Sequence, residues 1–151
     1  MKNYGYPNYK IRHNSDLLPL FIDKPMMYSK GEKFQYNNSG YVLLAMIIEK
    51  VTGMDFDQYL KINVFDVCDM KSTGYYELDR LPAKCAYNYI YCADTNDFRT
   101  NIFSVDVKGT GAGGAFITVK DIINFWLGLL NEKLISKELV SEMLNKQSGN
   151  G

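Results

Sequence analysis

The chain has 151 residues, a length typical of a single domain that buries about two thirds of its unfolded surface. Its 17 basic and 17 acidic side chains give a net charge of zero, which disfavours nonspecific binding to nucleic acids or anionic membranes. Aromatic residues make up 14% of the sequence, so a disordered chain is also excluded.

The first 14 residues are predicted to form an irregular arm, because they are rich in Tyr, Asn and Lys and include a Gly and a Pro. They lack the apolar segment of a secretory signal. An apolar patch at residues 17–21 predicts a short helix that is capped by Ser15 and ends before Pro25. Residues 25–33 are expected to form a loop.

Residues 34–53, FQYNNSGYVLLAMIIEKVTG, are the most informative stretch. The uninterrupted apolar run at 41–48 predicts a helix that is buried on all sides, from near Ser39 to near Thr52. Gly53 is expected to close this helix in a left-handed conformation. The run is too short to cross a bilayer, which takes about 20 residues.

Three polar residues, Tyr36, Asn37 and Asn38, come directly before this helix. One interpretation is structural: Asn37 or Asn38 caps the helix, since Asn is a favoured N-cap, and Tyr36 packs against it. The other is functional, because side chains at the start of a buried helix lie at the edge of the core, where they can meet a substrate.

Beyond Gly53, Asp55 is predicted to cap a second helix, whose apolar residues recur at helical spacing from Phe56 to Val64 and pack on the first helix. The aromatic-rich region 75–106 predicts a hairpin, with strands at 86–91 and 99–103 around a turn at 94–97. Its tyrosines are expected either to shape a substrate cleft or to cover the helical core.

The glycine-rich segment 109–114 lacks the residue order of a P-loop, so we do not expect it to bind nucleotides. Thr118 and Asp121 have the spacing of a capping box and predict the start of another helix. Asp121 is expected on the polar face of that helix. The opposite face is predicted to hold the apolar residues Val119, Ile122, Ile123, Trp126, Leu127 and Leu130. Ser136 is expected to cap a last helix.

Three cysteines, Cys68, Cys85 and Cys92, lack the paired spacing of a zinc site and are predicted to be free thiols. A disulfide between Cys85 and Cys92 across the hairpin is the alternative. The single histidine, His13, has no cluster of metal-ligating residues around it in the sequence. We therefore expect no metal site at these residues.

The string YNNSGYVLLAMIIEKVTG closely resembles the second motif region of the serine beta-lactamase and D,D-peptidase family. This family includes class C beta-lactamases, penicillin-binding carboxypeptidases and related esterases. The resemblance implies that Tyr36 is the catalytic Tyr of a Tyr-x-Asn motif and assists proton transfer. It also implies that Asn38 hydrogen-bonds the substrate's amide. Residues 65–74 and 113–121 are similar to two further segments of the family.

Two family motifs have no counterpart in this sequence. The nucleophile of the family is the Ser of Ser-x-x-Lys, and no serine here is followed by a lysine three positions later. Lys-Thr-Gly and His-x-Gly, the alternatives for the third motif, are also missing. Because a serine hydroxyl attacks poorly without a neighbouring base, we expect this chain alone to be inactive.

The expected fold is mainly α with irregular loops and a small β-hairpin. It corresponds to the helical part of the α/β beta-lactamase fold without most of its sheet. Residues 1–151 are expected to form a single helical subdomain of a larger hydrolase. The resemblance implies that this hydrolase cleaves an amide or ester through an acyl-enzyme without a metal or cofactor, and acts on a small-molecule or peptidoglycan-type substrate.

Two alternatives stay open: a non-catalytic module that binds peptidoglycan or peptides, and a chain whose missing parts come from another polypeptide. A partial fold is also expected to expose a broad apolar face where the missing sheet would pack, and to self-associate through it.

Overall fold

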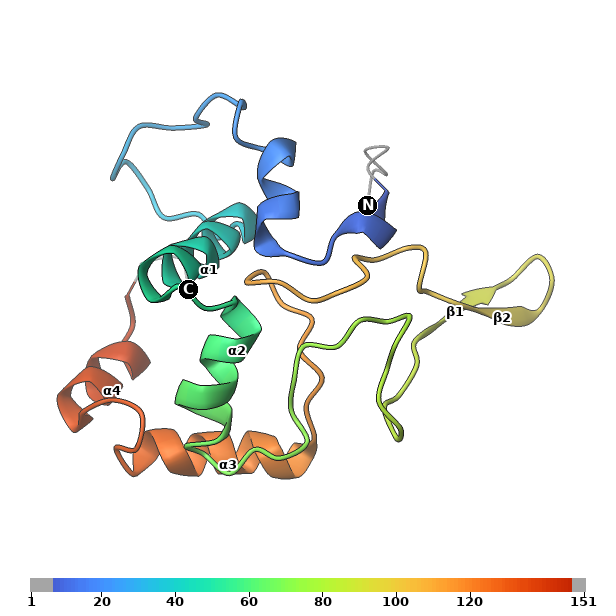
Figure 1. Ribbon diagram of the computed structural model, residues 1–151. Coiled ribbons are helices and arrows are strands. Elements are labelled where there is room, and N and C mark those ends of the chain that lie inside the picture. Colours follow the sequence, from blue (N-terminus) through green and yellow to red (C-terminus); the bar gives the residue numbers. More distant parts are fainter. Residues whose placement is uncertain (1–6, 148–151) are drawn as a thin grey trace.

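The computed structural model describes residues 7–147 (Figure 1). Among these residues, two short 3-10 helices, η1 (Asn8–Lys10) and η2 (Asn14–Leu20), precede the helices α1 (Asn38–Thr52) and α2 (Phe56–Leu60) and a π-helical segment, η3 (Lys61–Phe65). A hairpin of β1 (Tyr89–Cys92) and β2 (Asp97–Thr100) follows, and then α3 (Val119–Leu130) and α4 (Lys137–Leu144). The mainly helical architecture with one small hairpin confirms the coarse fold class predicted from sequence.

Helix α1 has the predicted boundaries but not the predicted burial. Asn37 is its N-cap, and Gly53 closes it with a φ of 69°. Only Val42 and Ala45 are buried, whereas Val51 is 79% exposed. The expectation of burial on all sides is therefore wrong for the described residues. The physical reason is that α1 packs on η2, α2 and the glycine-rich loop, and these elements cover only one of its sides.

The first predicted helix is a 3-10 helix with a different cap. His13, not Ser15, is the N-cap residue, and Asp16 accepts hydrogen bonds of 2.9 Å from the backbone N–H groups of Arg12 and His13. The Ser15 cap was wrong because the helix begins earlier, at Asn14, so that Ser15 lies inside its first turn. The predicted arm begins with residues 1–6, which lie outside the described residues, and continues through η1.

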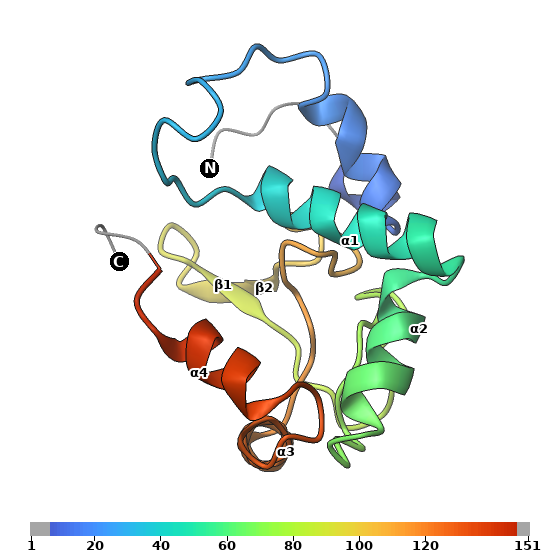
Figure 2. The same cartoon turned by 90° about the vertical axis from the view of Figure 1, so that its left-hand side faces the viewer.

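At the start of α2, Asp55 occupies the predicted N-cap position without a side-chain capping bond. The first backbone N–H of the helix, that of Phe56, instead donates to Glu49 Oε1 of α1 at 3.2 Å. As predicted, α2 packs on α1. The segment that follows buries Phe65, Cys68 and Met70 in a small core. In Figures 1 and 2, α2 runs between α1 at one end and α3 at the other.

Helix α3 begins as predicted but turns a different face inward. Thr118 Oγ1 accepts a 3.2 Å bond from the N–H of Asp121, which confirms the cap. Asp121 is only 3% exposed, and its carboxylate accepts 2.8 Å bonds from Ser72 N–H and Thr73 Oγ1. The sequence predicted that this carboxylate completes a capping box and lies on the polar face of the helix, and both predictions were wrong. The carboxylate is buried instead, because two donors from a distant segment form hydrogen bonds with it in the interior.

The remaining predicted elements agree with the structure. The hairpin pairs Tyr91 with Phe98 in antiparallel register, and both strands begin close to the expected positions. Ser136 caps α4 by accepting from the N–H of Leu139. All three cysteines, Cys68, Cys85 and Cys92, lie within residues 7–147 and are free thiols. The alternative of a disulfide between Cys85 and Cys92 is therefore wrong.

We expect Asp106→Asn to stabilise the protein at neutral pH but not in acid. Asp106 is half-buried, and burial raises the pKa of its carboxyl. A raised pKa in the folded state means that stability is lost as the pH rises through that pKa, because the charged form is disfavoured inside the fold. At about pH 3 the carboxyl is largely neutral, so Asp and Asn should then behave alike.

Urea unfolding of the wild type and Asp106→Asn at both pH values measures this difference. Asp94→Asn, in the exposed hairpin turn, is the control and should show no gain that is confined to neutral pH. Equal effects of Asp106→Asn on stability at both pH values would contradict a raised pKa of the Asp106 carboxyl.

Candidate active site

The two residues singled out from the sequence lie together at the N-terminal end of α1. Tyr36 Oη donates a 3.0 Å hydrogen bond to Asn38 Oδ1. Asn37 Oδ1 accepts a 2.7 Å bond from the N–H of Gly40 and so caps the helix. Asn37 is therefore the residue that caps the helix. The side chain of Asn38 instead accepts the hydrogen bond from the Tyr36 hydroxyl.

An open depression of about 350 Å³ lies beside Tyr36. Tyr36 is 61% exposed, and the centroid of its ring lies 5.4 Å from that of Tyr41. The depression is lined by Phe34, Gln35, Tyr36, Asn37, Gly40, Tyr41 and Leu44. Neither Tyr36 nor Asn38 is sealed in the core, so a molecule in this depression could contact the Tyr36 hydroxyl.

The glycine-rich loop holds this end of α1 by close backbone packing. A Cβ atom at position 111 would lie 2.6 Å from the Tyr41 carbonyl oxygen and 2.6 Å from Ala45 Cβ, so only Gly111 allows the loop to approach the helix. The backbone of Thr110 also exchanges two 2.9 Å hydrogen bonds with that of Gly113. These contacts give the glycine run a packing role against α1.

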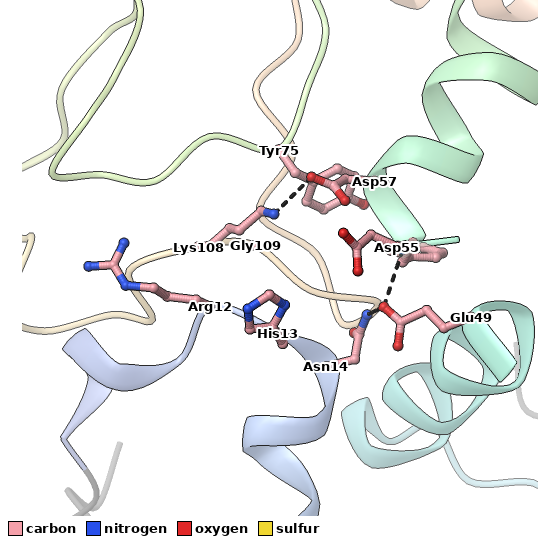
Figure 3. Close-up of a pocket in the computed structure, with 10 residues that line it drawn as sticks. Arg12, His13, Asn14, Glu49, Asp55, Asp57, Tyr75, Lys108 and Gly109 are labelled. Carbon is pink, nitrogen blue, oxygen red and sulfur yellow. Dashed lines mark hydrogen bonds and ion pairs between the residues drawn. The ribbon is translucent and has the colours of Figure 1, made fainter. Parts of the chain in front are cut away.

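A second, smaller cavity of about 20 Å³ lies where η2, α1, the start of α2 and the strand-like segment at 108–109 meet (Figure 3). Its polar groups bind one another. Asn14 Nδ2 donates to Glu49 Oε1 at 2.8 Å, and Lys108 Nζ forms a 2.8 Å ion pair with Asp57 Oδ2. Burial, together with the nearby Asp57 charge, raises the pKa of Tyr75. The space holds about one water molecule, so this cavity is too small for a substrate.

Sequence reasoning missed this polar cluster. Asn14, Glu49 and Lys108 are far apart in the chain, and Asp57 is half-buried against Lys108. Within residues 7–147, no three His, Cys, Asp or Glu side chains are placed to hold a metal ion. In the same range, no helix has the length and apolar character needed to span a bilayer.

Comparison with known proteins identifies the family. The beta-lactamase family model matches residues 4–151, which is nearly the whole chain. The chain belongs to the beta-lactamase family.

Named relatives of this beta-lactamase-family chain include penicillin-binding proteins and a related hydrolase. Penicillin-binding protein 4* of Bacillus subtilis is 28% identical over 88% of this chain and 32% of its own length. Teichoic acid D-alanine hydrolase of Staphylococcus aureus is 26% identical over 95% of this chain and 36% of its own length. The chain thus spans about a third of the length of these curated relatives.

A solved structure supports the same assignment. The penicillin-binding protein of Bacillus halodurans superposes with a TM-score of 0.90 and 37% identity, over 97% of this chain and 44% of that protein. The chain is therefore similar to less than half of that structure, as expected for the helical part of the fold. The roles of Tyr36 and Asn38 stay predictions.

We expect the two asparagines to respond differently to substitution. Asn37→Ala removes a helix cap and should lower the free energy of unfolding by about 1 kcal/mol. Asn38→Ala removes only a bond to an exposed hydroxyl and should change it by less than about 0.5 kcal/mol. Urea unfolding of the two variants is the measurement, and equal losses would contradict this division of roles.

Proposed function

We propose that this chain supplies the Tyr-x-Asn part of the active site of a serine hydrolase that cleaves an amide or ester through an acyl-enzyme. The observation that carries the proposal is the 3.0 Å hydrogen bond between Tyr36 Oη and Asn38 Oδ1. This bond lies at the exposed end of α1, beside an open and largely apolar depression. Membership of the beta-lactamase family supports the same reaction type.

Tyr36 is proposed to carry a proton to or from the nucleophile or the leaving group. A phenol has a reference pKa of about 10, so it needs a nearby cation to work as a base at neutral pH. By resemblance to the family, that cation is the Lys of Ser-x-x-Lys, a motif that this sequence lacks. The catalytic role of Tyr36 therefore depends on a portion of the fold beyond this chain.

Asn38 is proposed to bind the substrate. Its Oδ1 atom accepts from Tyr36, so the amide Nδ2 group is the part of the side chain that can donate to the carbonyl of a substrate amide. The same bond restricts rotation of the carboxamide and directs the donor away from Tyr36. Loss of Asn38 should therefore weaken substrate binding more than proton transfer.

A D-amino acyl group or a related peptidoglycan-type compound is the substrate class we favour. One relative is named as a hydrolase of teichoic acid D-alanine, and others are named as penicillin-binding proteins. The depression beside Tyr36 is lined by Phe34, Tyr41 and Leu44, whose apolar surfaces suit a small acyl group. Beta-lactamase, D,D-carboxypeptidase and esterase activities all belong to this reaction type.

The isolated 151-residue chain should not turn over substrate, because no serine in it has a lysine at one-turn spacing. The measurement is hydrolysis of nitrocefin and of a p-nitrophenyl ester by the purified chain, which should not exceed that of buffer alone. Turnover that Tyr36→Phe abolishes would contradict the proposal that the nucleophile lies outside this chain.

The alternative of a non-catalytic binding module is tested on the same sample. It predicts that the isolated chain binds a soluble peptidoglycan fragment without hydrolysing it, and calorimetry detects such binding. Under the hydrolase proposal, the incomplete site should give no measurable heat of binding with that fragment. Binding that survives Tyr36→Phe and Asn38→Ala would place the ligand elsewhere on the molecule.

A further inference from the structure

Tyr36 lies outside α1, so the helix does not fix its side chain directly. It comes two residues before Asn38, the first residue of α1, and is largely exposed. An exposed side chain changes rotamer within picoseconds to nanoseconds unless contacts restrain it. Because a group that transfers a proton must stay close to the atoms that react, Tyr36 needs partners that fix its orientation.

A hydrogen bond and a ring contact restrain the Tyr36 side chain. Its hydroxyl donates to Asn38 Oδ1 at 3.0 Å, and the centroid of its ring lies 5.4 Å from that of Tyr41. The two ring planes are tilted by 45°, and their separation lies in the range in which aromatic rings attract one another. The side chain is therefore bonded at its tip and packed along its ring.

Both partners of Tyr36 lie on the same side of α1. Asn38 and Tyr41 are three positions apart, a spacing that places two side chains on one helix face. The Tyr36 side chain thus folds back over the first turn of α1. Water can replace Asn38 as the partner of an exposed hydroxyl, so the hydrogen bond alone restrains the side chain weakly. Water cannot replace a contact between two rings, so the contact with Tyr41 is the stronger restraint.

The glycine-rich loop holds Tyr41 itself from the inner side of the helix. The loop approaches so closely that a Cβ atom at Gly111 would lie 2.6 Å from the Tyr41 carbonyl oxygen. The side chain of Tyr41 lines the depression beside Tyr36 and is about half exposed. Tyr41 therefore joins a backbone that packs on the loop to a ring that contacts Tyr36.

We propose that Tyr41 is a positioning residue, whose ring keeps the Tyr36 hydroxyl beside Asn38. This inference rests on the proposed function, because the orientation of the phenol matters to the reaction only if Tyr36 transfers a proton. An aromatic pair favours its paired arrangement by roughly two- to tenfold. Without the Tyr41 ring, Tyr36 should occupy its present rotamer for a correspondingly smaller part of the time.

The test is nuclear magnetic resonance on the 151-residue chain with labelled tyrosine. Three-bond couplings from the backbone nitrogen and carbonyl carbon to Cγ measure the χ1 rotamer populations of Tyr36, whose signals are assigned by their loss in Tyr36→Phe. The wild type should give the couplings of one rotamer. Tyr41→Phe should give the same values, because it keeps the ring that makes the contact. Tyr41→Leu should give averaged couplings, with the population of the main rotamer lowered at least about twofold relative to the others.

Leu44→Ala is the matched control. Leu44 lies on α1, lines the same depression and is 58% exposed, against 48% for Tyr41, but it is not the ring that packs on Tyr36. The control should keep the couplings of one rotamer. Circular dichroism checks that each variant retains its helices, and Tyr41→Leu should do so because leucine favours a helix more than tyrosine does. If it does not, Tyr41→Met provides the same test.

Three results would overturn the positioning role of Tyr41. They are averaged couplings in the wild type, one rotamer retained in folded Tyr41→Leu, and averaging in Tyr41→Phe or Leu44→Ala to the same extent as in Tyr41→Leu. The proposed function fails by a different measurement, namely turnover by the isolated chain that Tyr36→Phe abolishes. Such turnover would leave the rotamer populations, and with them the contact between the two rings, as measured.

Discussion

One buried carboxamide joins four segments of the described part of the molecule, including the helix that carries the candidate site. Asn14, which is 4% exposed, donates to Glu49 Oε1 at 2.8 Å and accepts from the N–H of Gly111 at 2.8 Å. Glu49 Oε1 also accepts from the N–H of Phe56. The side chain of Asn14 thereby joins η2, α1, the start of α2 and the glycine-rich loop. Because each unpaired buried group is costly, these contacts are expected to form together.

The position of the candidate site follows from this junction. Gly111 is bound by Asn14 and lies against Tyr41 and Ala45, so the loop supports the first turns of α1 from the inside. The N-terminal end of that helix carries Asn37 as cap and presents Tyr36 and Asn38 at the surface. Tyr36, proposed to transfer a proton, and Asn38, proposed to bind the substrate, thus lie at a helix end whose other contacts are structural.

Features that depend on neighbours in the chain could be predicted from the sequence. Asn37 and Gly53 bound α1, Thr118 and Ser136 cap their helices, and the hairpin lies at the expected turn, because each depends on residues a few positions away. Tyr36 and Asn38 were selected by their resemblance to a family motif.

Burial could not be predicted in the same way, because it depends on partners far away in sequence. Asp121 is buried by donors at positions 72 and 73, and the bonds of Asn14 span 35 and 97 residues. The apolar run of α1 predicts burial on all sides, yet the described residues cover only one side. The sequence pattern of a segment thus does not by itself decide which of its sides is covered.

Hydrogen exchange of the wild type and Asn14→Ala, read by mass spectrometry, tests the role of Asn14 most directly. If Asn14 joins the segments, exchange should accelerate together in residues 38–52 and 109–114, and the free energy of unfolding should fall by about 2–4 kcal/mol. Asn124→Ala, which removes a more exposed bond to the Asp69 carbonyl, should not reproduce this pattern. Faster exchange confined to residues 14–20, with α1 and the glycine-rich loop unchanged, would contradict the central role given to Asn14.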